Sequence, residues 1–141
     1  MTDRRPTVTV LLPVFNSARY LREALDTVLQ QTYTDLEVLV IEDGSTDASA
    51  AILGTLRDPR VRVIRHATNQ GLIRSLNEGL SEARGRYIAR MDADDRMHPE
   101  RIARQVAHMD AHPELAALAT RVEFINADGN VTGHWDTDQA A

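Results

Sequence analysis

The chain has 141 residues, of which 43% are hydrophobic and 26% are charged, and its formal net charge is −5. This length fits one domain with a sizeable core, and the composition excludes wholesale disorder. An acidic chain offers no basic surface for nucleic acid. All 16 basic residues are arginines and no cysteine is present, so lysine-dependent chemistry, disulfide bonds and thiolate metal sites are excluded.

The two ends of the chain bear on location. The amino-terminal apolar run is too short to span a membrane and lacks a cleavage signal. We therefore expect a cytoplasmic protein without a membrane segment, and a full-length protein could still act at the cytoplasmic membrane face. The carboxyl-terminal residues form no clear closing element. We expect one domain over residues 1–141 that is a piece of a longer protein, with surface exposed for self-association.

Strands and helices alternate four times along the chain. Expected strands cover residues 7–13, 36–42, 61–65 and 87–91, where aliphatic and β-branched residues cluster. Expected helices cover 18–31, a segment capped by Thr46 or Asp47, 72–83, and a segment with Pro99 at its first position. Residues 115–135 indicate two further strands joined by a hairpin at Asp128-Gly129.

The third helix carries a clear apolar pattern. Its apolar positions recur at helical spacing and are expected to face the core: Leu72, Ile73, Leu76, Leu80 and Ala83. Gly85 stands where a C′ glycine ends a helix.

This alternation predicts an α/β fold with a Rossmann-like, mainly parallel sheet flanked by helices. In open sheets of this class, ligands bind at the carboxyl ends of the strands. Five notable polar residues fall at those ends: Asn16, Asp43, Asn69, Asp92 and Asp94.

The acidic run at residues 92–95 follows the fourth strand directly. Because side chains alternate along an extended segment, Asp92 and Asp94 point the same way. Two hard oxygen ligands on one side suit Mg²⁺ or Mn²⁺, which share their shell with water and substrate phosphates. The alternative is a solvated acidic turn that caps the next helix.

Five motifs in one order resemble glycosyltransferase family 2, whose members are inverting, metal-dependent enzymes with the A-type nucleotide-binding fold. They are PVFN at residues 13–16, EDGSTD at 42–47, NQGL at 69–72, LNEGL at 76–80, and Tyr87-Ile88 before DADD at 92–95. The resemblance spans roughly residues 7–135.

The resemblance implies roles for named residues. Pro13, Val14, Phe15 and Asn16 belong to the nucleotide site, and Asp43 accepts a hydrogen bond from the base, uracil being the first candidate. Asp92 approaches the ribose or a metal-bound water, and Asp94 ligates the metal that bridges the diphosphate. Without the resemblance, Asp43 is equally well a turn carboxylate bonding its own backbone. Arg74 faces the diphosphate or base, or is a solvated helix arginine.

The implied reaction uses a nucleoside diphosphate sugar, with a UDP-sugar preferred, and a divalent cation to stabilise the leaving diphosphate. The acceptor hydroxyl belongs to a saccharide, lipid or protein glycan. In the family, the general base is an Asp well downstream of the D-x-D. We therefore expect the base beyond residue 141, and a donor-binding part that is inactive by itself.

Other readings stay open. A nucleotidyltransferase would carry a Gly-rich phosphate loop after the first strand, and a receiver-type domain would need a lysine. A noncatalytic nucleotide-sugar binding module is close to an isolated donor part. Trp135 could stack on a sugar or close the hydrophobic surface. The i, i+4 spacing of His108 and His112 could make a metal pair, but we expect surface positions for these two residues because no third ligand follows them.

Overall fold

The structure is a computed structural model that describes residues 4–135. The chain forms two compact units, residues 1–106 and residues 107–141. A single domain over the whole chain stays a prediction. Among residues 4–135, every helix is too short or too polar to cross a lipid bilayer.

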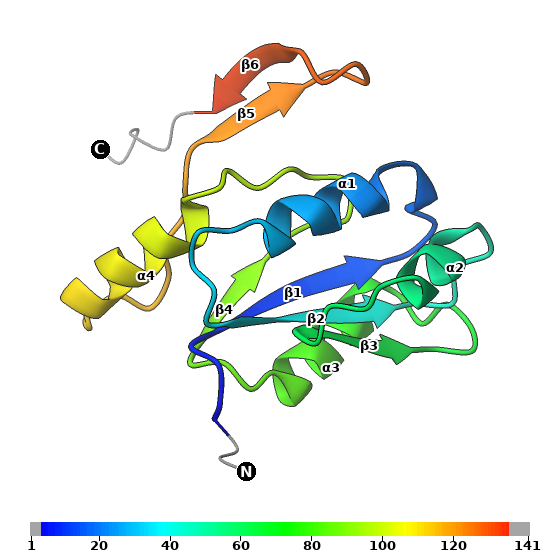
Figure 1. Cartoon of the computed structure of the whole chain (residues 1–141), viewed down its shortest axis with the longest axis horizontal. Coiled ribbons are helices and arrows are strands. Elements are labelled where there is room, and N and C mark those ends of the chain that lie inside the picture. The colour runs from blue at the N-terminus through cyan, green and yellow to red at the C-terminus, as the bar shows by residue number, and fades with distance from the viewer. Residues whose placement is uncertain (1–3, 136–141) are drawn as a thin grey trace. The chain divides into compact units, whose positions relative to one another are not determined.

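The first unit is built on a four-stranded parallel sheet (Figure 1). The strands are β1 (Val8–Val14), β2 (Leu36–Glu42), β3 (Val61–Arg65) and β4 (Tyr87–Arg90), in the order β3-β2-β1-β4. β1 and β2 lie in the middle and are covered on both faces, which is why they read as nearly unbroken aliphatic runs. This sheet confirms the predicted Rossmann-like α/β fold.

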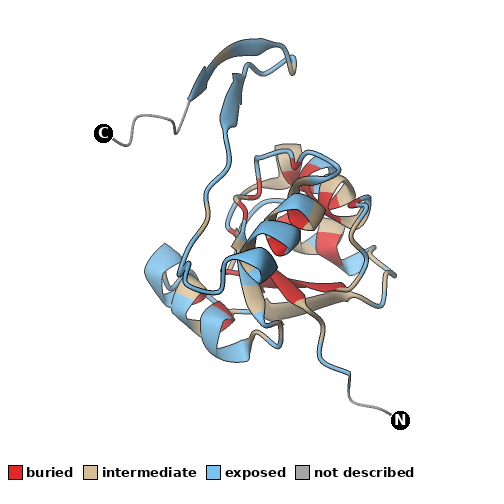
Figure 2. Cartoon of the chain, turned by 90° about the vertical axis from the view of Figure 1, so that its left-hand side faces the viewer, coloured by how far each residue is buried: buried red, intermediate tan, exposed pale blue. Residues whose placement is uncertain are grey.

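Helices cover both faces of this sheet (Figure 1). They are α1 (Ala18–Leu29), α2 (Ser49–Gly54), α3 (Leu72–Glu82) and the start of α4 (Arg101–Ala111). The larger core cluster joins the strands to the apolar stripe of α1 and to the first turns of α4, and a smaller one lies under α3. Figure 2 shows the resulting band of buried residues along the sheet.

The predicted inner face of α3 is partly wrong. Leu72, Ile73 and Leu80 are exposed, Ile73 to 77%, whereas Ser75 and Gly79 are buried. A Cβ atom on Gly79 would lie 2.2 Å from the Cδ1 atom of Leu11. The helix therefore lies against the sheet through its small residues, and an apolar stripe does not reveal that choice. Leu76 and Ala83 do contact the core as expected.

Gly85 does not end α3 as a C′ residue. The helix ends at Glu82, and its C-cap residue, Ala83, already has extended backbone angles. Gly85 instead donates its N–H to Thr9 Oγ1 at 2.9 Å, and a Cβ atom there would lie 2.3 Å from the Thr9 nitrogen. The glycine is required by this close approach to β1. Pro99 likewise precedes α4, which begins at Arg101, and its carbonyl accepts the N–H of Thr32.

The second unit contains the end of α4 and the predicted hairpin. Its strands, β5 (Val122–Ile125) and β6 (Val131–Trp135), pair in antiparallel fashion with a register shift between Phe124 and Ile125. In the turn, Gly129 has φ of +83° and Asn126 Oδ1 accepts the N–H groups of Asp128 and Asn130. Asn126 therefore supplies the side-chain acceptor that holds the loop.

Candidate functional site

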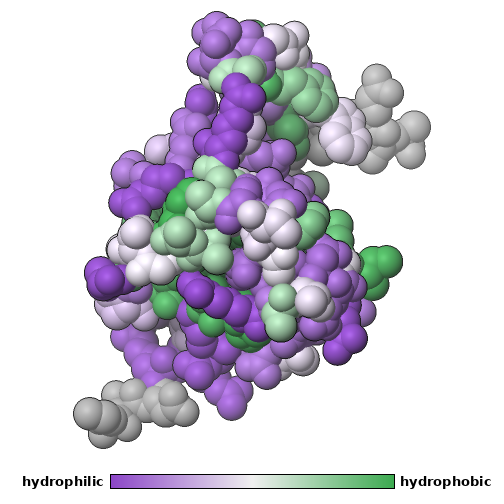
Figure 3. Space-filling model, turned by 90° about the vertical axis from the view of Figure 1, so that its right-hand side faces the viewer, coloured by the Kyte–Doolittle hydropathy of each residue, from purple (hydrophilic) through white to green (hydrophobic). Residues whose placement is uncertain are grey.

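A cavity of about 700 Å³ lies at the carboxyl ends of β1, β2 and β4. It is lined by Pro13, Val14, Phe15, Asn16, Ser17, Arg19, Tyr20, Asp43, Asn69, Leu72, Ser75, Asp92, Ala93 and Asp94. The strands run toward the right-hand side of Figure 1, and Figure 3 views the protein from that side, with hydrophobic side chains among hydrophilic ones. The topology thus brings together six of the seven predicted nucleotide-binding residues, among them the predicted metal ligand Asp92, and also the second predicted metal ligand, Asp94.

The loop after β1 is shaped by Asn16. Its φ of +48° is a left-handed conformation that asparagine tolerates better than most residues. Its Oδ1 accepts the N–H groups of Thr46 (2.8 Å) and Asp47 (3.3 Å), which joins this loop to the one after β2. Asn16 therefore positions the cavity wall, while the neighbouring Phe15 exposes an apolar ring to it.

Asp43 is the most heavily bonded acid in the cavity wall. Its Oδ1 accepts hydrogen bonds from His66 Nδ1 (2.7 Å) and the N–H of Gln70 (2.8 Å), and its Oδ2 accepts the N–H of Gly71 (2.9 Å). Burial tends to raise the pKa of this carboxyl, but the hydrogen bonds outweigh burial and lower it below 3.8. Three acceptor positions are used, so about one of the four on a carboxylate remains for a ligand.

His66 links Asp43 to α3. Its Nδ1 faces Asp43, and its Nε2 lies 2.5 Å from Glu78 Oε2. The hydrogen bonds to Asp43 and Glu78 raise the pKa of this imidazole above 6.5, although burial opposes them. Sequence reasoning gave His66 no role in the site, although its side chain is only 6% exposed. The signal was its place directly after β3, beside β2 and the Asp43 that follows that strand.

These two pKa shifts predict how stability varies with pH. The lowered pKa of Asp43 favours the folded state above pH 3.8, and that contribution is lost as the pH falls through the folded-state pKa. The raised pKa of His66 favours the folded state below pH 6.5, and that contribution is lost as the pH rises through its folded-state pKa. Urea unfolding across this range should therefore show a decline at the alkaline end that His66→Asn lacks. Identical alkaline profiles would contradict the assignment.

Both acids of the loop after β4 lie at the cavity. Met91, Ala93 and Met97 are buried, whereas Asp92 is half-buried and Asp94 is exposed, and both acids line the cavity. The loop is a turn in which the Asp95 N–H donates to the Asp92 carbonyl at 3.2 Å, so it is not the extended segment that side-chain alternation requires.

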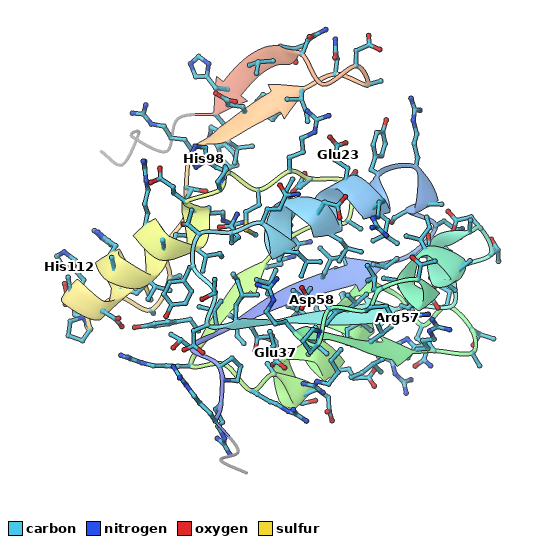
Figure 4. All side chains as sticks on the ribbon, viewed as in Figure 1. Glu23, Glu37, Arg57, Asp58, His98 and His112 are labelled. Atoms are coloured by element: carbon cyan, nitrogen blue, oxygen red, sulfur yellow. The ribbon has the colours of Figure 1, made fainter. Side chains whose placement is uncertain are left out.

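Helix α1 holds this loop in place. Thr27 Oγ1 accepts the N–H of Met97 (3.1 Å), and Gln31 Nε2 donates to the carbonyl of His98 (2.8 Å). Arg96 also pairs with Glu23 of α1 at 2.8 Å, and Figure 4 labels Glu23 on that helix. These contacts fix the position of the loop that carries Asp92 and Asp94.

The two acids differ in what they contact. Arg90 donates to both oxygens of Asp92, at 2.7 and 3.1 Å. Asp94 has no such partner among residues 4–135 and is exposed. Burial and the charges of Asp92 and Asp94 raise the pKa of the neighbouring Asp95 carboxyl. The cluster thus favours a cation, and Asp94 is the carboxylate most available to it.

This site fits a metal ion that brings its own ligands. Within residues 4–135, no three His, Cys, Asp or Glu residues are grouped closely enough to hold a metal by themselves. Two carboxylates at an open cavity instead match Mg²⁺ or Mn²⁺, which take waters and substrate phosphates for the rest of the shell. The rings of His108 and His112 lie with their centres 4.5 Å apart and tilted by 32°, and Figure 4 labels His112 just after α4.

Sequence reasoning misplaced one residue and missed others. Arg74 is exposed on α3 and is not among the residues that line the cavity, so its contact with a nucleotide stays a prediction. Arg19 and Tyr20 line it instead, with the guanidinium 5.0 Å from the ring centre. Ser75 also lines it, and its buried hydroxyl has no hydrogen-bond partner among the described residues. Helical periodicity marks Ser75 as polar surface, which is why it was missed.

Comparison with known proteins decides the family. The sequence profile described as "Glycosyl transferase family 2" matches residues 9–138. The chain belongs to glycosyltransferase family 2. This confirms the resemblance seen in the five motifs.

Similar proteins are glycosyltransferases and polysaccharide synthases. An uncharacterized glycosyltransferase of Haemophilus influenzae is 37% identical over 122 residues, which cover 85% of this chain and 38% of the relative. The hyaluronan synthase of Pasteurella multocida is 33% identical over 131 residues, covering 92% of this chain and 13% of the synthase. The chain therefore spans well under half the length of these family 2 relatives.

Solved structures share the fold. Staphylococcus aureus TarS 1–349 in complex with UDP-GlcNAc superposes with a TM-score of 0.72 at 29% identity, covering 76% of this chain and 32% of that one. The mannosyltransferase PcManGT from Pyrobaculum calidifontis, in complex with GDP-Man and Mn²⁺, gives a TM-score of 0.67 at 28% identity, covering 76% and 33%. This family 2 chain thus has the fold of proteins that bind nucleotide sugars.

Proposed function

We propose that this chain is the donor-binding part of a glycosyltransferase and binds a nucleoside diphosphate sugar in the cavity at the strand ends. One observation carries the proposal: three acids line the same cavity in two places. Asp43, buried and ionised, follows β2, and Asp92 and Asp94 follow β4 on the other side of β1. A nucleotide has a base that donates hydrogen bonds at one end and a diphosphate that needs a cation at the other. The cavity supplies acceptors for the first and cation ligands for the second.

The base would lie near Asp43. Only about one acceptor position of this carboxylate is unoccupied, which suits a single N–H group at the base edge. Phe15 and Tyr20 bring rings to the same cavity and can pack against a flat base. The unpaired Ser75 hydroxyl offers a further polar group, because a buried hydroxyl gains free energy when a polar ligand reaches it.

Uracil is the base that we propose. Its ring carries one N–H flanked by two carbonyl groups, and a carboxylate with one open acceptor position reads a single N–H well. The TarS structures contain UDP and UDP-GlcNAc, whereas PcManGT contains GDP-Man. The binding ratio of uridine to guanosine diphosphate tests this choice.

The diphosphate would lie near Asp94. A bound Mg²⁺ or Mn²⁺ would stabilise negative charge on the leaving diphosphate. Asp94 would ligate it, and Asp92 would ligate it or hold one of its waters after release from Arg90. Inverting transfer, the acceptor's nature and a general base outside residues 1–141 stay predictions.

Asp94→Asn should remove the metal-dependent part of nucleotide affinity. An amide keeps the size of the side chain but loses the charge that the cation requires. In Mn²⁺, we expect uridine diphosphate to bind this variant at least about tenfold more weakly than it binds the unmodified chain, an effect of roughly 1.4 kcal/mol or more. The affinity of the variant should be the same in Mn²⁺ and in chelator. Calorimetry in both conditions measures the difference.

Asp95→Asn is the matched control, since it removes the same charge from the same cluster at a position that does not line the cavity. It should keep most of the Mn²⁺ effect. An Asp94→Asn protein that still binds nucleotide more tightly with Mn²⁺ than with chelator would contradict the metal role.

A further inference from the structure

The three-residue chain Asp43–His66–Glu78 lies behind the cavity wall. Asp43 ends β2, His66 follows β3, and Glu78 lies in the middle of α3. The ring of His66 contacts a carboxylate oxygen at each nitrogen, at 2.7 Å and 2.5 Å. An ionised carboxylate only accepts hydrogen bonds, so both ring nitrogens donate when both carboxylates are ionised. The geometry therefore suits an imidazolium, which carries a positive charge between two negative ones.

This cation organises more than Asp43. The Asp43 carboxylate also accepts the N–H groups of Gln70 and Gly71, and Gly71 is the N-cap residue directly before α3. Asn69, the residue before Gln70, lines the cavity. One protonated ring therefore fixes the acid in the cavity wall, the turn at residues 69–71 and the helix that follows.

We propose that His66 is a positioning residue for the donor nucleotide, and that the cavity holds a nucleoside diphosphate at full strength only while His66 carries both ring protons. This inference rests on the proposed function and deepens it, since it says what maintains the acid that meets the base. His66 itself does not line the cavity. It acts through Asp43.

Loss of one proton changes the site in two ways. A neutral ring donates from only one nitrogen, so one of its two carboxylate contacts becomes a repulsion between lone pairs. Glu78 is 35% exposed and can turn to water, whereas Asp43 is buried. The wall also loses a positive charge beside the place where a ligand with a negatively charged diphosphate would bind. Both changes weaken nucleotide binding.

Among the charged residues near His66, Asp43 and Glu78 are the two whose side chains contact its ring. The charged residues on or directly after β2, on β3 and on α3 are Glu37, Glu42, Asp43, Arg62, Arg65, Arg74, Glu78 and Glu82. Arg62 pairs with Glu37 at 3.5 Å and with Glu82 at 3.3 Å. Glu42 accepts the N–H of Ser45 at 2.7 Å, and Arg65 donates to the carbonyl of Ala50 at 3.2 Å. Arg74 is exposed.

The first arm of the test follows the ring directly. Nuclear magnetic resonance titration of the nucleotide-free chain should show His66 titrating above pH 6.5. Glu78→Gln, which keeps an acceptor but removes a charge, should lower that titration point. The proposal is overturned if the His66 ring titrates below pH 6.5, or if Glu78→Gln leaves its titration point unchanged.

The second arm measures uridine diphosphate affinity in Mn²⁺ between about pH 6 and about pH 8.5, the range in which histidine charge is adjustable. The unmodified chain should lose affinity by about tenfold as His66 loses its proton, which corresponds to about one pKa unit of preference for the charged ring. The Glu78→Gln variant should bind uridine diphosphate as tightly as the unmodified chain at the acidic end of the range. Its affinity should then begin to fall at a lower pH than that of the unmodified chain. His66→Asn, which keeps one N–H toward Asp43, should bind more weakly without this decline. His108→Gln, on the exposed part of α4, should behave as the unmodified chain does.

The outcomes separate this inference from the proposed function. If the unmodified chain binds no nucleotide at any pH, the proposed function fails and this inference fails with it. If the chain binds nucleotide and His66→Asn shows the same pH profile, the proposed function stands and His66 is merely structural. Protonation of uridine diphosphate itself contributes equally to every pH profile. The test therefore compares the pH profiles of the variants with that of the unmodified chain.

Discussion

Asp43→Ala is expected to abolish measurable binding of uridine diphosphate and to lower the free energy of unfolding by about 3–5 kcal/mol, the cost of breaking a buried charged pair. The strand-end position alone suggested a variant that folds normally. The structure shows instead that removal of this carboxylate leaves His66 and two backbone N–H groups without their acceptor. Calorimetry with nucleotide and urea unfolding measure the two effects.

Asp58→Ala is the control that separates lost stability from lost binding. Asp58 is also a bonded carboxylate, held by Arg60 at 2.8 Å, and the Arg60 contact lowers its pKa in spite of burial. It does not line the cavity. This variant should lose stability and keep its affinity for nucleotide. An Asp43→Ala chain that retains both its stability and its affinity would show that Asp43 neither stabilises the fold nor binds the nucleotide.

Gly44→Ala is expected to destabilise the chain by about 3 kcal/mol, since it combines left-handed strain with a steric clash. Gly44 has φ of +68°, and a Cβ atom there would lie 2.5 Å from the carbonyl carbon of Thr68 and 2.6 Å from the nitrogen of Asn69. Both contacts are to backbone, so the loop must move. Asn69 lines the cavity, and nucleotide affinity should fall together with stability.

The matched glycine control is Gly54→Ala, at the end of α2. The nearest atom to an added Cβ there is a guanidinium nitrogen of Arg65 at 3.9 Å, an ordinary contact. The substitution should be neutral or stabilise the chain by up to about 1 kcal/mol. Thermal unfolding of both variants is sufficient. Equal unfolding temperatures would show that the approach of Gly44 to residues 68–69 carries no constraint.

The sheet and the position of the acidic loop could be predicted because each rests on a local signal. Aliphatic runs mark β1 and β2 as doubly covered strands, and the acidic run follows the fourth strand directly in the sequence. The carboxyl-end rule then predicts which residues meet, even though Asn16 and Asp94 are 78 positions apart in the chain.

The remaining features depend on distances between elements, which no local pattern encodes. Ser75 and Gly79 form the buried side of α3, and Leu11 lies so close to Gly79 that a Cβ atom there would clash with it. Gly85 is explained by the backbone of Thr9, and His66 by two acids that are 23 and 12 positions away. Each of these residues has a plausible local reading, as a surface serine, a helix stop or an exposed histidine, and tertiary packing overrides it.

The most direct test of the central claim is paramagnetic mapping of Mn²⁺ in the presence of uridine diphosphate. In a ¹⁵N-labelled chain, the amide signals of residues 92–95 should broaden first as Mn²⁺ is added. With Mg²⁺ in place of Mn²⁺, added nucleotide should shift the signals of Phe15, Asp43 and Asn69, which line the other parts of the cavity. The amides of Arg60 and Arg84, at the opposite ends of the strands, should stay unchanged. Broadening centred away from residues 92–95, or nucleotide shifts confined to the Arg60 and Arg84 side, would contradict the account.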